Sequence, residues 1–173
     1  MELLKEILLV AIPSLIVFFT AYLLIRKSIE NDRERRRQEI ILQNSRTITP
    51  VRLQAYERLT LFLERMSMES LIMRTNKQGM DAKKLHSTLL STIRSEYDHN
   101  LAQQIYVSPQ AWEVIKSARS NTIKLINTIA EQIPPTATGS ELSKNLLEAV
   151  MEMDQEPAMV ALVFLKKEIS TML

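Results

Sequence analysis

The sequence predicts an all-α protein, with one N-terminal transmembrane helix, a helical stalk and then a bundle of four or five helices. Only two of the 173 residues are Gly, which is too few for the many turns of a β-sandwich or β-barrel. No segment alternates apolar and polar residues with a period of two. Apolar residues instead recur every three or four positions, and prolines interrupt these helical patterns.

The first predicted element is a membrane anchor over residues 1–27. Residues 7–25 carry no charged side chain, and thirteen of these nineteen residues are Leu, Ile, Val or Phe. A helix of this length covers about 28 Å, close to the ~30 Å hydrocarbon core of a bilayer. A cleaved signal peptide is disfavoured, because the apolar run is long and is followed by Arg26 and Lys27 rather than by a small-residue cleavage site.

Basic residues just after the anchor predict its orientation. By the positive-inside rule, they place the short N-terminus outside and the C-terminal domain in the cytoplasm, at the inner (cytoplasmic) membrane. The lipid bilayer is therefore the first expected partner, and we interpret the cations as lipid-proximal charge. Nucleic acid is not expected, because no stacking aromatic residues lie near them. The membrane-proximal basic residues are Arg26, Lys27, Arg33, Arg35, Arg36 and Arg37.

Residues 28–48 form the predicted stalk. Ile29 is the only strongly apolar residue between Arg26 and Glu39, so this segment cannot bury a face. Pairs such as Asp32 with Arg36 have the i,i+4 spacing that supports a solvated helix.

Residues 49–173 form the predicted cytoplasmic α-helical bundle. Helix starts are indicated at Thr49-Pro50, Asp81, Ser108-Pro109 and Thr138, where Glu141 completes a capping box. Pro134-Pro135 ends one helix, and Pro157 starts the last. The uncharged run 158–165 is too short to cross a bilayer, so we expect a central, buried helix there. The connections are short, which favours antiparallel packing of sequential helices.

Of the eight methionines in this region, we expect six to fill the core, although a Met-rich face can also form an adaptable groove for a partner. They are Met66, Met68, Met73, Met151, Met153 and Met159.

Composition excludes several kinds of site. There is no Cys, which removes disulfides, thiol nucleophiles and Cys-ligated metals. Two distant glycines cannot form a phosphate-binding loop. From Pro50 onward, fourteen basic groups balance fourteen acidic groups, so the bundle offers no electrostatic reason to bind nucleic acid.

One stretch concentrates polar and aromatic side chains, and it is the candidate functional or structural cluster. Glu96 and His99 have the Glu-x-x-His spacing of di-iron bundles, but such a site needs a second copy of the motif, which the chain lacks. His86 is expected to be a solvated or rim residue. We therefore expect no catalytic residue, metal ligand or cofactor. The members of the cluster are Arg94, Glu96, His99, Asn100, Gln103, Gln104, Tyr106 and Trp112.

The chain resembles an uncharacterised family of bacterial proteins that have one N-terminal span, a charged stalk and a helical cytoplasmic region. The matching residues are Tyr56-Glu57-Arg58-Leu59, residues 69–74, and Glu96 with His99-Asn100-Leu101, Gln103-Gln104, Tyr106, Ser108 and Trp112. The resemblance covers most of the chain. It implies a location but no activity, because the family carries none.

Three functions remain open. The first is a membrane-anchored helical adaptor or scaffold that docks a protein partner. The second is a membrane-tethered enzyme or metal-binding domain centred on Glu96 and His99. The third is a stator-like or sensory coupler acting through the stalk. The first needs no chemistry, and the sequence displays none, so an enzyme is the less favoured interpretation. Partner identity and oligomeric state do not follow from these residues.

Overall fold

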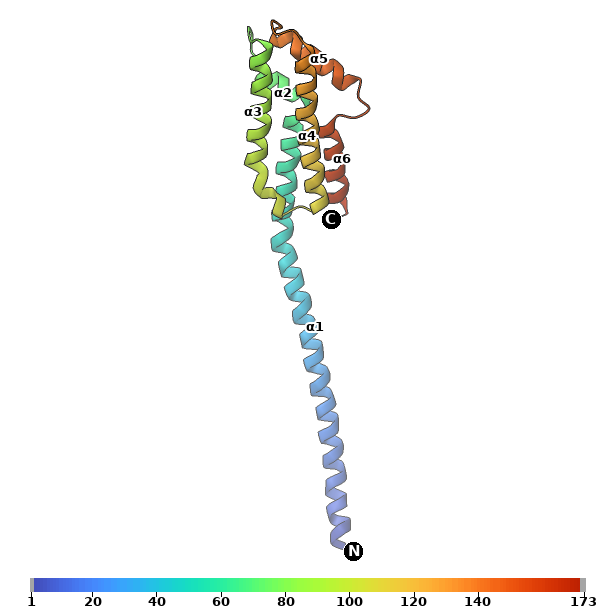
Figure 1. Ribbon diagram of the computed structural model, residues 1–173. Coiled ribbons are helices and arrows are strands. Elements are labelled where there is room, and N and C mark those ends of the chain that lie inside the picture. The colour runs from blue at the N-terminus through green and yellow to red at the C-terminus, as the bar shows by residue number, and fades with distance from the viewer. Residues whose placement is uncertain (1, 172–173) are drawn as a thin grey trace. The chain divides into compact units, whose positions relative to one another are not determined.

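The regular structure of the described residues is helical throughout (Figure 1). The structure is a computed structural model that describes residues 2–171, with the side chains of residues 2–8, 10–13, 41, 44 and 45 outside the description. This confirms the all-α part of the prediction. The elements are α1 (Glu2–Met66), α2 (Met68–Thr75), α3 (Ala82–Asn100), the 3-10 helix η1 (Leu101–Ile105), α4 (Pro109–Gln132), α5 (Gly139–Met151) and α6 (Pro157–Ser170).

The predicted transmembrane helix is contradicted. Among the described residues, no helix is both long enough and apolar enough to cross a membrane. The residues that the search covered include Leu9 and residues 14–25 of the apolar run, which Arg26 follows. The rest of the predicted span, residues 7, 8 and 10–13, lies outside the described side chains. The predicted inner-membrane location conflicts with the same finding.

The chain divides into two compact units, residues 1–49 and 50–173. In the second unit, the predicted helix starts at Asp81, Ser108 and Thr138 are confirmed. Each of these side chains accepts a hydrogen bond from a backbone N–H of the first turn. The predicted start at Thr49-Pro50 is wrong, because α1 continues through both residues. A proline inside a helix removes one backbone hydrogen bond but need not end the helix.

The core of the second unit lies between the last turns of α1 and helices α2 to α6. Residues 55–66 of α1 place one face inward, and the side chains of Leu59, Phe62 and Leu63 are at most 1% exposed. Leu85, Leu89 and Ile93 of α3 and Ile115 and Ile126 of α4 are equally buried. Helices α4 and α6 lie side by side and run in opposite directions (Figure 1).

Helix α6 is only half buried, which corrects the expectation of a central helix. Ala158, Ala161, Leu162 and Leu165 lie in the core, whereas Met159, Val160 and Val163 are exposed. A helix that packs on one side of a bundle buries only one stripe, whatever the polarity of its other positions.

The expectation that the methionines fill the core holds only for Met66 and Met68. The exposed methionines are Met73, Met151, Met153 and Met159.

A short bridge between two loops holds one end of the bundle together. Asp81 and Thr138 form an isolated antiparallel bridge, in which Ala82 N–H donates to Ala137 O at 3.0 Å and Gly139 N–H donates to Met80 O at 2.7 Å. Gly139 is needed at this contact, since a Cβ there would lie 2.9 Å from Met80 O. The bridge therefore requires a residue without a side chain at the start of α5.

We predict that Gly139→Ala lowers the free energy of unfolding by about 1–3 kcal/mol, because the added methyl group forces the two loops apart. Ser140→Ala, at the next and exposed position, is the control and should change it by less than about 0.5 kcal/mol. Urea denaturation of the two variants measures both values. Equal stability of the two variants would contradict the close contact.

Candidate functional site

Glu96, from the predicted polar cluster, joins three helices. Its Oε1 atom lies 2.6 Å from Arg65 Nη2 of α1 and 3.2 Å from Arg74 Nη1 of α2. Arg74 also donates through Nη2 to the carbonyl oxygen of Arg65 at 2.7 Å. The Glu96 side chain is 21% exposed, so solvent screens the two ion pairs only in part. The arrangement ties α1, α2 and α3 together at this carboxylate.

Next to Glu96, an aromatic group fills the space between α1, α3 and α4. The rings of Tyr97 and Trp112 stack with centroids 5.5 Å apart, and Phe62 lies 6.1 Å from Tyr97 at a tilted angle. The Arg119 guanidinium carbon sits 4.2 Å from the centroid of the Tyr97 ring, within cation–π distance. Arg119 Nε is buried and has no hydrogen-bond partner, so the ring face is its main polar neighbour. Trp112 is thus a packing residue.

The other members of the cluster do not converge on one point. Asn100 is buried and donates through Nδ2 to the carbonyl oxygen of Glu96 at 2.8 Å, which satisfies the end of α3. Gln103 is buried as well, and the carbonyl oxygen of Tyr106 accepts a bond from Arg52 Nε at 3.1 Å. The exposed members are Arg94, His99, Gln104 and Tyr106. The residues of the cluster therefore have different roles: Glu96 joins helices, Asn100 satisfies the end of α3, and the exposed members face solvent.

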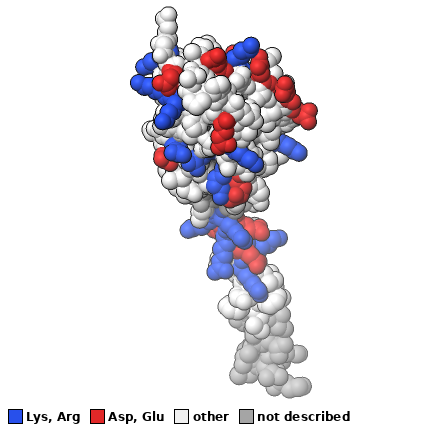
Figure 2. All heavy atoms as spheres, turned by 45° about the horizontal axis from the view of Figure 1, so that its top comes forward, with Lys and Arg blue, Asp and Glu red and all other residues white. Residues whose placement is uncertain are grey.

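No group of three His, Asp or Glu side chains that could hold a metal occurs among the described residues. The basic residues that the sequence predicted beside a membrane, Arg26, Lys27, Arg33, Arg35, Arg36 and Arg37, are all exposed on α1. On the face of the bundle in Figure 2, positive and negative side chains are interspersed, with no field of a single sign.

A buried polar contact joins α1 to α6 at the other side of the core. The Tyr56 hydroxyl donates to Glu168 Oε1 at 2.7 Å, and Tyr56 is only 2% exposed. Burial, followed by the hydrogen bond and the negative charge of Glu168, raises the pKa of Tyr56 to about 12. Glu168 Oε2 is buried without a partner, so the Tyr56 hydroxyl is the one donor that the structure gives this carboxylate.

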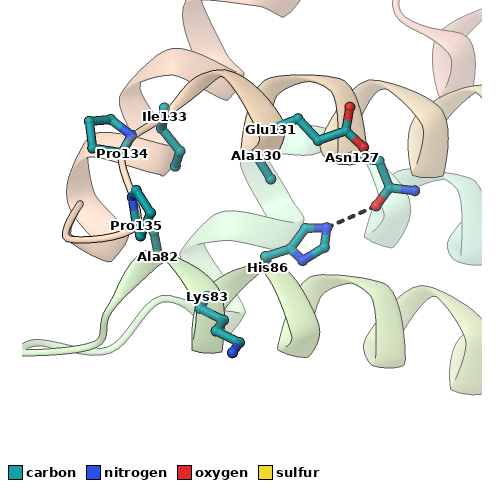
Figure 3. A pocket seen from close by; sticks show the side chains of 9 residues that line it. All are labelled: Ala82, Lys83, His86, Asn127, Ala130, Glu131, Ile133, Pro134 and Pro135. Atoms are coloured by element: carbon teal, nitrogen blue, oxygen red, sulfur yellow. Dashed lines mark hydrogen bonds between the residues drawn. The ribbon is translucent and has the colours of Figure 1, made fainter.

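His86 is half-buried and lines a pocket, which agrees with the expectation of a solvated or rim residue. The pocket has a volume of about 380 Å³ and lies between the start of α3, the end of α4 and Pro134-Pro135 (Figure 3). His86 Nε2 and Asn127 Oδ1 are 2.8 Å apart and join the two helices. The charged residues that line the pocket are Lys83 and Glu131, and both are exposed. The apolar part of the lining comes from Ala82, Ala130, Ile133, Pro134 and Pro135. No sequence pattern links His86 to Asn127, which is 41 positions away.

The outer face of α6 is the most exposed apolar surface of the bundle that lies beside a groove. It consists of Met159, Val160 and Val163, which are 48%, 44% and 57% exposed. A groove of about 440 Å³ lies next to it, between α4 and the α5–α6 connection. Its apolar lining comes from Val114, Ala118, Met153, Pro157 and Val160.

The α6 outer face has charges of opposite sign at its two ends. Glu152 and Asp154 are exposed in the segment before α6, and Lys166 and Lys167 are exposed in its last turns. None of these four makes an ion pair within the described residues. The face thus consists of an apolar centre with one acidic end and one basic end.

These features define an all-α helical-bundle protein with a structural polar cluster and an uncovered apolar face on α6. The chain belongs to a family described as a family of unknown function, DUF7935, whose match covers residues 2–172. Membership of an uncharacterised family, as the resemblance implied, is therefore confirmed. No curated protein and no solved structure matches the chain.

Replacing Glu96 tests whether its role is structural. Glu96→Gln should lower the free energy of unfolding by about 1 kcal/mol, because it removes both ion pairs and leaves Arg65 and Arg74 to repel each other. His99→Gln, on the same turn and exposed, should change it by less than about 0.5 kcal/mol. Thermal and urea denaturation at low salt measure the effect. If Glu96→Gln left the free energy of unfolding unchanged, the role of Glu96 in joining the helices would be refuted.

Alkaline pH tests the contact between Tyr56 and Glu168. Because the folded-state pKa of about 12 exceeds the ordinary value of 10.0, the folded protein holds this proton more tightly than the unfolded chain does. The resulting stabilisation, roughly 2 kcal/mol, is complete below pH 10 and is lost as the pH rises toward 12. Tyr56→Phe lacks this contribution, so the stability difference between wild type and variant should narrow from pH 9.5 to 11.5. A constant difference would contradict the assignment.

Proposed function

We propose that this protein is a helical docking module whose binding surface is the α6 outer face, and that it receives an amphipathic helix of a protein partner. The observation that carries the proposal is the exposure of Met159, Val160 and Val163 on adjacent turns beside the α4–α6 groove. An exposed apolar group rimmed by polar residues is typical of an interaction surface. The proposal keeps the adaptor interpretation of the sequence without a membrane anchor.

The shape of the surface favours a helix as the occupant. Helix-in-groove recognition uses apolar residues on one face of the bound helix, spaced over two or three turns. The α6 outer face presents its three apolar residues within the first two turns of a fourteen-residue helix. Met153 and Met159 add side chains that can adapt to different apolar shapes.

The charges at the two ends favour one direction of the bound helix. Because of the helix dipole, basic residues favour the C-terminal end of a helix and acidic residues its N-terminal end. The C-terminal end of the bound helix, with basic residues, would therefore lie beside Glu152 and Asp154. The acidic residues of the bound helix would lie beside Lys166 and Lys167. The proposed partner is therefore an amphipathic helix with charges of opposite sign at its two ends.

Val163→Asp tests this surface, with Leu61→Asp as the matched control. Leu61 is an apolar residue of α1 that is also 57% exposed but lies outside the α6 outer face. We expect Val163→Asp to weaken partner binding at least tenfold, because the complex would bury an unpaired carboxylate, while Leu61→Asp retains binding. Circular dichroism should report intact helices in both variants.

The partner for this measurement is identified by a photo-crosslinking amino acid at position 163 in the full chain, followed by sequencing of the crosslinked peptide. The peptide should be an amphipathic helix with opposite charges at its ends. Equal binding by the two aspartate variants, or crosslinking at position 61 to the same peptide, would overturn the proposal.

A further inference from the structure

We infer that the amphipathic helix received by the α6 outer face is α6 of a second copy of this chain, paired with it in antiparallel orientation about a two-fold axis. This inference rests on the proposed docking surface and names its occupant. A two-fold interface requires a surface that is complementary to itself. The α6 outer face meets this requirement in both its apolar centre and its charges.

The charge pattern is self-complementary in the antiparallel orientation. The apolar residues centre between Val160 and Ala161, so antiparallel pairing about this point brings Lys166 and Lys167 in the last turns of one α6 toward the segment that precedes α6 in the other copy. That segment carries Glu152 and Asp154. The arrangement repeats at the other end of the interface by symmetry. A parallel pairing would instead bring lysines against lysines and acids against acids.

Spacing and packing agree with this register. The distance along α6 from the point between Val160 and Ala161 to Lys167 is about 10 Å. The apolar residues therefore lie between the two charged ends. Antiparallel helices also align their macrodipoles favourably. At the centre, Met159 and Val163 of one copy would pack around Val160 of the other at an ordinary interhelical distance of about 8–10 Å.

The size of the face predicts a weak dimer. A helix of fourteen residues is about 21 Å long, and together with the rim of the α4–α6 groove it provides a contact at the low end of specific interfaces. We therefore expect dissociation in the micromolar range, which sedimentation can measure. Charge should contribute strongly to such a small contact.

Two charge-reversed variants of the full chain test the pairing by analytical ultracentrifugation. The first, Lys166→Glu/Lys167→Glu, has an interface with acidic residues at both ends. The second, Glu152→Lys/Asp154→Lys, has basic residues at both ends. Each variant alone should dimerise at least tenfold more weakly than the wild type, because like charges then face each other. An equimolar mixture should recover an affinity within about threefold of the wild type, because both ends then pair opposite charges.

A second pair of variants controls for general attraction between unlike proteins. Lys83→Glu/Lys84→Glu and Glu57→Lys/Glu64→Lys change the same number of exposed charges outside the α6 outer face. Each should dimerise as the wild type does, and mixing them should gain nothing. The inference would be overturned if both charge-reversed α6 variants dimerised as strongly as the wild type. It would also be overturned if the equimolar mixture of these two variants stayed monomeric.

The outcomes separate this inference from the proposed function. If the wild type is monomeric at 200 µM but Val163→Asp still weakens binding of a crosslinked partner, the docking surface stands and its occupant is another protein. If Val163→Asp changes neither dimerisation nor partner binding, both proposals fail.

Discussion

The burial of the last three turns of α1 is the constraint on which the bundle depends. Residues 55–66 supply Leu59, Phe62 and Leu63 to the centre of the core, where each is at most 1% exposed. Polar contacts then orient this segment from two sides, through Arg65 to Glu96 of α3 and through Tyr56 to Glu168 of α6. Without residues 55–66, α3 and α6 would each lose apolar contacts and one polar partner. Losses of this kind cause the larger destabilising effects of mutations in proteins.

The same constraint explains why the predicted polar cluster does not form a binding site. Consecutive residues of a helix point about 100° apart, so the side chains between Arg94 and His99 cannot share one direction. Glu96 is directed to α1 and α2, and Tyr97 to the core, while Arg94 and His99 remain in solvent. The uncovered apolar residues Met159, Val160 and Val163 lie on α6, because this helix buries only one side.

Local signals allowed much of the fold to be predicted. Asp81, Ser108 and Thr138 begin helices because their side chains bond to backbone groups two or three residues away, and a sequence contains that information. The continuation of α1 through Pro50 could not be predicted, because the proline pattern also fits a helix start. The exposed side of α6 and the contact between His86 and Asn127 depend on which helices become neighbours. The periodicity of apolar residues does not predict which helices pack together. The predicted membrane span depended on an apolar run of which only Ser14 to Ile25 is described in full.

Native-state hydrogen exchange of the full chain tests most directly whether the end of α1 belongs to the bundle core. The account predicts that backbone amides of residues 57–66 exchange with the same opening free energy as those in the middle of α3 and α4, because all three segments share one cooperative core. Amides in the last turn of α6 should exchange sooner. If residues 57–66 opened at a clearly lower free energy than α3 and α4, the claim that α1 completes the core would be contradicted.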